Sequence, residues 1–61
     1  MKRRDLIREI EALGVTVVFK EGGSHTRVEI DGRLVTTIPR HREIAEGTAR
    51  NILRLVKEAS T

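Results

Sequence analysis

Hydrophobic residues near the start of the chain recur with the spacing of an amphipathic helix. Between positions 2 and 13, steps of one, three and three residues separate the aliphatic side chains Leu6, Ile7, Ile10 and Leu13. This spacing lines one side of a helix that has about 3.6 residues per turn. Gly14 comes next, and glycine readily takes the left-handed conformation with which many helices end. The pattern predicts a helix over residues 2–13.

The pattern then changes to that of β-strands. Residues 15–20 are mostly β-branched or aromatic and have no helical stripe, which predicts a first strand. A second strand is predicted over residues 25–30, where β-branched residues alternate with polar ones. A third is predicted over residues 33–38, which returns as its antiparallel partner.

Turn residues separate these predicted strands. Gly22-Gly23 stands between the first and the second. Asp31-Gly32 stands between the second and the third, and it is a strong hairpin signal because both central residues of such a turn need a positive φ. Pro39 has no N–H to donate to a ladder, so the third strand should end there.

A charged connection over residues 40–47 leads to a second helix, for which Thr48 is the predicted N-cap. Its aliphatic positions repeat at three and four and are Ala49, Ile52, Leu53, Val56 and Ala59. The element order is therefore α-β-β-β-α. We predict an α+β fold in which a three-stranded antiparallel sheet carries two helices on one face. A chain of 61 residues without repeats or linkers is expected to form one domain, residues 1–61.

Alternation along the second strand predicts where its side chains point. Val28 and Ile30 should face the helices, which places His25, Arg27 and Glu29 on the opposite, open face. This prediction uses alternation within one strand only, so it does not depend on the hairpin register.

The composition of the chain excludes several kinds of functional site. The chain has no cysteine, which excludes disulfides and thiolate catalysis. Its two histidines, His25 and His41, lack the spacing of a metal site, so we expect neither a metal nor another cofactor. No apolar run approaches the ~20 residues that cross a bilayer, and no secretion signal is visible. We therefore expect a cytoplasmic protein without membrane contact.

The net charge of +3 is modest, and the basic surplus lies toward the two ends of the chain. On the second predicted helix, Arg50, Arg54 and Lys57 recur opposite the apolar stripe. They could form an RNA phosphate-binding edge, or simply a solvated helix face. Because Phe19 is the single aromatic residue, recognition by stacked bases is not expected.

Several short motifs occur in a distinctive order, namely Gly22-Gly23-Ser24-His25, Asp31-Gly32, Ile38-Pro39-Arg40-His41 and Gly47-Thr48. Together they resemble the HicA (YcfA-like) toxin family over nearly the whole chain. The resemblance implies a fold like that of double-stranded-RNA-binding domains, ribonuclease activity on messenger RNA and neutralisation by a HicB antitoxin. It also maps the catalytic histidine of the family onto His25.

The side chains present can also supply the proton transfers that RNA cleavage needs. RNA scission needs one group to take a proton from a 2′-hydroxyl and another to protonate the departing 5′-oxygen, and histidine can do either near neutral pH. His25 is the main candidate. His41 is the candidate second group, although the residues themselves favour the alternative that it is an ordinary loop histidine, which caps or is merely solvated. Gly23, Ser24 and Arg27 are candidates for phosphate contact. The alternative roles are a plain turn for the first two and a partner of an acidic side chain for Arg27.

Three functions stay open at this point. The first is a slow, metal-independent endoribonuclease toxin that uses His25 as general acid or base. The second is a noncatalytic RNA-binding module of the same fold. The third is a subunit without nucleic-acid function whose open sheet face is covered by a protein partner.

Overall fold

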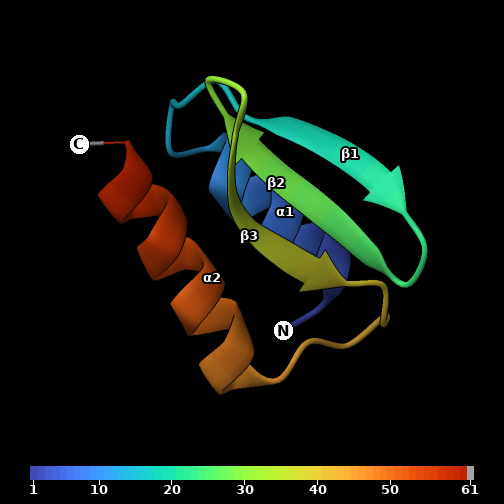
Figure 1. The fold of residues 1–61 in the computed structure, drawn as a ribbon. Coiled ribbons are helices and arrows are strands. Elements are labelled where there is room, and N and C mark those ends of the chain that lie inside the picture. Colours follow the sequence, from blue (N-terminus) through green and yellow to red (C-terminus); the bar gives the residue numbers. More distant parts are fainter. Residues whose placement is uncertain (61) are drawn as a thin grey trace.

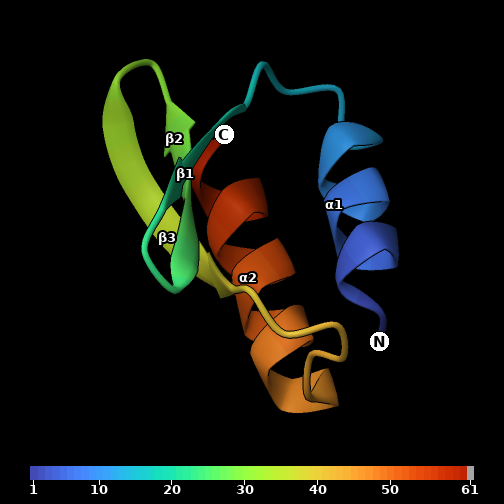
Figure 2. The same ribbon diagram turned by 90° about the vertical axis from the view of Figure 1, so that its right-hand side faces the viewer.

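A computed structural model describes residues 1–60. The elements follow in the order α1 (Arg3–Glu11), β1 (Val18–Gly22), β2 (His25–Ile30), β3 (Arg33–Pro39) and α2 (Glu46–Ala59). The strands form one antiparallel sheet in the order β1-β2-β3. Both helices lie on the same side of this sheet, as Figures 1 and 2 show. The predicted α-β-β-β-α fold is confirmed.

The boundaries of β1 differ from the prediction. The strand begins at Val18 instead of residue 15 and continues to Gly22. Residues 15–17 instead cross from the helix layer to the sheet, and Val15 and Val17 pack against the core on the way. The ladder with β2 decides both limits, since Val18 pairs with Glu29 near the end of β2 and Gly22 pairs with its first residue.

The start of α2 also differs. The helix begins at Glu46, so Thr48 lies inside it and is not the N-cap. Ala45 takes the cap position without a side-chain hydrogen bond. Tertiary contacts hold this turn instead, because the amino group of Met1 donates to Ile44 O at 3.0 Å and pairs with Glu46 Oε1 at 3.4 Å. Glu46 also places a negative charge in the first turn, where the helix dipole favours it.

The hairpin between β2 and β3 has the predicted turn, since Asp31 and Gly32 have φ values of 53° and 76°. The register then shifts, because Val28 pairs with Thr36 whereas Glu29 pairs with Leu34. This β-bulge inserts one extra residue, Val35, into β3. The partly buried Val35 packs against the core, while Leu34 is 53% exposed.

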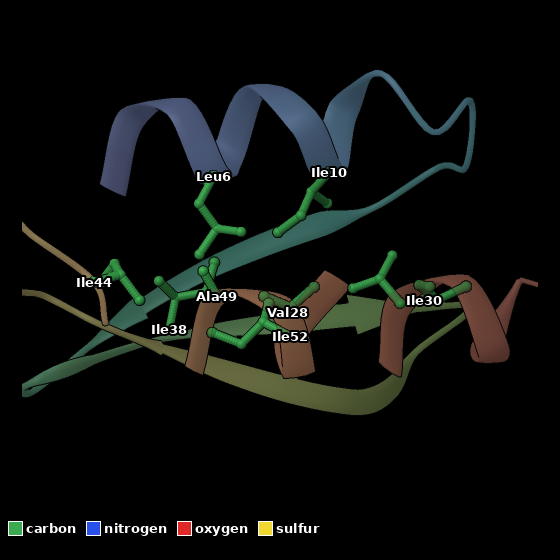
Figure 3. Packing of buried hydrophobic residues seen from close by; sticks show 9 residues of the cluster. Leu6, Ile10, Val28, Ile30, Ile38, Ile44, Ala49 and Ile52 are labelled. Atoms are coloured by element: carbon green, nitrogen blue, oxygen red, sulfur yellow. The ribbon is translucent and has the colours of Figure 1, made fainter. Parts of the chain in front are cut away.

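The core fills the space between the sheet and the helices (Figure 3). Each element except β1 contributes buried aliphatic side chains, and so does the loop before α2; they are Leu6, Ile10, Val28, Ile30, Ile38, Ile44, Ala49, Ile52 and Val56. Burying one such Leu, Ile or Val side chain contributes about 1.5–3 kcal/mol. The helices therefore bind one face of the sheet firmly and leave its other face open. Within residues 1–60, neither helix has the length and apolarity needed to span a bilayer.

Candidate functional site

His25 is the first residue of β2 and is exposed. The next residue, Thr26, is fully buried. Val28 is also fully buried and Ile30 is nearly so, which means that these three side chains face the helices. Alternation therefore places His25 on the open face of the sheet, as predicted from the sequence. Its neighbours across the sheet are Gly22 on β1 and Pro39 on β3. Gly22 has no side chain, which leaves one flank of the imidazole uncovered.

A hydrogen bond joins the imidazole to the adjacent turn. Ser24 Oγ lies 3.1 Å from His25 Nδ1. The hydroxyl can accept a hydrogen bond from Nδ1–H or donate one to Nδ1, so it can support either tautomer of the ring. Among residues 1–60, Nε2 has no partner, which makes it the ring nitrogen that can reach a substrate.

The turn that carries Ser24 is tight. Gly23 has a φ of 52° and Ser24 does not have a positive φ, the combination of a type II′ hairpin turn. A side chain at position 23 would meet open space but would be strained by the positive φ. Gly23 therefore lets the turn reverse immediately before His25.

Three charged side chains cover the open face beside His25. Arg27 Nε lies 3.6 Å from Glu29 Oε2, and Lys20 Nζ lies 3.3 Å from Glu29 Oε1. Glu29 is on the predicted face, yet it is only 7% exposed because these basic side chains enclose it. Both cations stay exposed, and one carboxylate cannot neutralise both. The cluster thus leaves a local positive charge next to the imidazole, and its Lys20 was not identified from the sequence.

A polar network lies directly behind His25, on the helix side of the sheet. Thr26 Oγ1 donates to Glu21 Oε1 at 2.8 Å and accepts a hydrogen bond from Arg3 Nη2. Arg40 Nη1 pairs with the same Glu21 oxygen at 3.4 Å. The sequence analysis missed this network because its members come from four separate segments. The available signal was Thr26 itself, since a hydroxyl at a core-facing position needs a partner.

His41 lies in the loop after β3 and is exposed. Its neighbour Arg40 donates its backbone N–H to Ser24 O at 3.2 Å, which ties the start of this loop to the turn before His25. The structure therefore brings the segment of His41 to the same end of the sheet as His25. No side chain among residues 1–60 forms a hydrogen bond or ion pair with His41.

The basic residues predicted on α2 lie elsewhere. Arg50, Arg54 and Lys57 are exposed in the helix layer, whereas His25 is on the uncovered face of the sheet. Arg54 is engaged within the helix, because it donates to Asn51 Oδ1 at 2.6 Å and pairs with Glu58 at 3.1 Å. The candidate residues thus form two separate groups, and the group around His25 contains Gly23, Ser24 and Arg27.

Residues 1–60 contain no cluster of three His, Cys, Asp or Glu side chains arranged to hold a metal ion. The chemistry available around His25 consists of an imidazole, a hydroxyl and exposed cations. Such a set can transfer protons and attract a phosphate, whose oxygens guanidinium groups bind in a two-pronged manner.

Comparison with known families gives one match. A family model described as the HicA toxin of bacterial toxin-antitoxin matches residues 3–57 of the 61-residue chain. The chain belongs to the HicA toxin family. As a HicA-family protein it is the toxin of a toxin–antitoxin pair, and an antitoxin partner goes with that role. The matched segment contains the whole sheet and therefore His25 with its turn.

Searches of curated proteins and of solved structures found no significant match. The expected likeness of this HicA-family fold to double-stranded-RNA-binding domains therefore stays a prediction.

Proposed function

We propose that this HicA-family toxin is an endoribonuclease that cleaves messenger RNA, with His25 as its general acid or base. The observation that carries the proposal is the placement of His25, whose imidazole is exposed on the open sheet face beside Ser24 and the cations of Lys20 and Arg27. Family membership supports the toxin role in which such an activity would act.

The proposed reaction is an internal transesterification of RNA. The 2′-oxygen attacks the adjacent phosphorus, a new P–O2′ bond forms and the P–O5′ bond breaks. A base takes the proton of the 2′-hydroxyl, and an acid supplies a proton to the leaving 5′-oxygen. The products are a 2′,3′-cyclic phosphate and a 5′-hydroxyl end, so no water or metal ion has to enter the bond-breaking step.

His25 is assigned one of the two proton transfers, through Nε2. Ser24 supports this role because its hydroxyl engages Nδ1 and thereby orients the ring. We assign the second transfer to His41, which stands in the loop that Arg40 ties to the Ser24 turn. A single positioned acid or base accelerates a reaction by about 10² to 10⁴-fold. Because the site offers so few such groups, we expect the protein to cleave RNA slowly.

Arg27 is the proposed phosphate-binding side chain of the site. It lies two residues from His25 on the same face of β2, and its guanidinium remains exposed although it pairs with Glu29. Positive charge at this place would favour the extra negative charge that develops on the phosphate during attack. Gly23 and Ser24 would allow the RNA backbone to approach closely at the turn.

We further propose that the antitoxin is a HicB-like protein that covers this open face. Leu34 is 53% exposed and Val18 is 46% exposed, and the register places both on either side of Glu29 on that face. A partner that buried these two side chains would also block the approach of RNA to His25.

The direct test is induction of the toxin in a bacterial host. The wild type should arrest growth, and His25→Ala should relieve the arrest at equal protein level and with unchanged thermal unfolding. The matched control is Arg8→Gln, which removes an exposed charge from α1 far from the turn. Undiminished arrest by His25→Ala would refute the catalytic role.

The purified protein should also cut a labelled transcript in the presence of a chelator. The fragments should carry 5′-hydroxyl ends, which a polynucleotide kinase labels without prior phosphatase treatment.

The basic residues of α2 favour a second candidate function, a noncatalytic RNA-binding module. Such a module would bind the transcript with strong salt dependence and leave it intact.

A further inference from the structure

A small hollow of about 240 Å³ opens where the start of α1 meets the loop between β3 and α2. Every side chain that lines it is basic; they are Lys2, Arg3, Arg4 and Arg42. Backbone contacts hold its two sides together, because Arg3 N donates to Arg42 O at 2.9 Å and Lys2 forms a β-bridge with Glu43. The fold thus assembles four cations from two segments that are distant in sequence.

Little negative charge compensates these cations. Among residues 1–60, Lys2 and Arg42 form no ion pair. Within the same residues, Arg4 approaches only the half-buried Asp5, at 3.8 Å. The carboxylates of Glu43, on the loop, and of Glu46, in the first turn of α2, instead pair with the amino group of Met1.

Arg3 also has a buried hydrogen-bond donor at this place that lacks a partner. Its Nη2 donates to Thr26 and lies 3.9 Å from Glu21 Oε1, but its buried Nε has no hydrogen-bond partner. Clustered like charges repel one another, and an unpartnered buried donor is costly. An anion in the hollow would relieve the repulsion.

The hollow lies at the same end of the sheet as His25. Arg3 reaches across to Thr26, the residue that follows His25 on β2. The loop that supplies Arg42 starts at Arg40, whose backbone is bonded to Ser24. A chain of direct contacts therefore connects the hollow to the turn that holds His25, although the two open on different faces of the sheet.

We propose that this hollow binds a backbone phosphate of the RNA strand whose scissile phosphate lies at His25. The inference rests on the proposed ribonuclease function and extends it by a second, noncatalytic contact. The lining consists of basic side chains without an aromatic ring on which a base could stack, so the hollow suits a phosphate group better than a base. The strand would run from the open face around the end of the sheet past Arg40.

The test compares two double variants that remove equal charge. Lys2→Gln/Arg42→Gln empties the hollow of its two unpaired cations. Arg8→Gln/Arg33→Gln removes two exposed arginines that do not line it. All four side chains are exposed, so both variants should fold, which thermal unfolding checks.

The probe is a fluorescent 2′-O-methyl RNA strand, which cannot undergo the proposed cleavage. Its affinity is measured over a range of salt concentrations. The hollow variant should bind about tenfold more weakly at low salt, and its plot of log affinity against log salt should be less steep by about 0.7, the value for the loss of one phosphate contact on a single strand. The control variant should stay within about threefold of the wild type, as expected for screened surface charges.

Equal losses in the two double variants, or no binding of the strand by the wild type, would overturn the proposed phosphate site. A parallel cleavage assay with an unmodified transcript separates this result from the proposed function. If the wild type cuts the transcript and the hollow variant cuts it with unchanged KM, the hollow is not a phosphate site but the ribonuclease function stands. If the wild type cuts nothing while binding still depends on the hollow, the ribonuclease function fails and the phosphate site stands.

Discussion

The two ends of the three-stranded sheet are held by different interactions. At the end that carries His25, polar and charged groups from α1, β1, β2 and the loop after β3 meet around Thr26 and Glu21. At the opposite end, the β2–β3 hairpin and the end of α2 border a hollow of about 420 Å³. Aliphatic side chains, among them Ile30, Leu34 and Leu55, line it together with the charged Asp31, Arg33 and Glu58. The first end depends on contacts between distant segments, and the second on a turn and on apolar packing.

This difference indicates that the two ends of the sheet have different roles, one in stability and the other in the proposed cleavage. Substitutions at the apolar end should lower the stability of the fold without a specific effect on the proposed cleavage. Substitutions at the polar end should change cleavage even where the stability is little affected. The predictions below test this separation, from the largest expected effect to the smallest.

The largest effect is expected at the apolar end. Ile30→Ala removes most of a side chain that is nearly buried, which should lower the free energy of unfolding by about 2–4 kcal/mol. Chemical denaturation measures this loss. Leu34→Ala on the neighbouring strand is the control, because its exposed side chain should contribute less than about 1 kcal/mol. The folded fraction of Ile30→Ala should cleave RNA at the wild-type rate, and a specific loss of activity would contradict this separation of roles.

The next effect concerns the polar network behind His25. Thr26→Val keeps the shape of the side chain but removes the hydroxyl that joins Arg3 to Glu21. The loss should lower the free energy of unfolding by about 1–3 kcal/mol, because partly buried partners are left unsatisfied. Thr37→Val, at an exposed position on β3, should change it by less than about 0.5 kcal/mol. Equal effects of the two substitutions would show that the network contributes nothing.

Two glycines allow a direct comparison of the ends. Gly23 and Gly32 both have a positive φ, and neither has a neighbour that an added Cβ would meet. Alanine at either position should therefore cost about 1–2 kcal/mol of stability from backbone strain alone. Only Gly23→Ala should also reduce RNA cleavage, because it disturbs the turn that holds Ser24 and His25. A matching loss of activity in Gly32→Ala, after correction for the unfolded fraction, would break the comparison.

The smallest effect is expected from Ser24→Ala. This change removes the hydrogen bond to His25 Nδ1 on the exposed surface, so the free energy of unfolding should hardly change. Cleavage should slow by about threefold to tenfold, the equivalent of one hydrogen bond of roughly 1 kcal/mol. Single-turnover rates with saturating protein measure this change in the chemical step. Ser60→Ala, at the end of α2, serves as the control and should leave the rate unaltered.

Much of the fold could be predicted because its signals are local. The apolar stripe that includes Leu6 and Ile10 specified α1, and Asp31-Gly32 specified the hairpin through the φ values that it needs. Alternation along β2 placed Val28 inside and His25 outside. Each of these inferences depends on neighbouring residues in the chain, which is why a single sequence was sufficient.

The remaining features depend on contacts that no local pattern encodes. The start of α2 at Glu46 follows from its contact with Met1, and the near burial of Glu29 follows from Lys20 on the adjacent strand. The bulge at Val35 shifts the alternation of β3 without a distinctive sequence signal.

The sequence by itself determined the order of the elements and the face of the sheet on which His25 stands, since helix and strand periodicity act over a few residues. Only the tertiary structure decided that the basic residues of α2 lie apart from His25 and that Lys2, Arg3, Arg4 and Arg42 gather at its end of the sheet. The physical reason is that electrostatic contacts depend on distance in space, which chain folding sets through packing of the apolar core and not through spacing along the sequence.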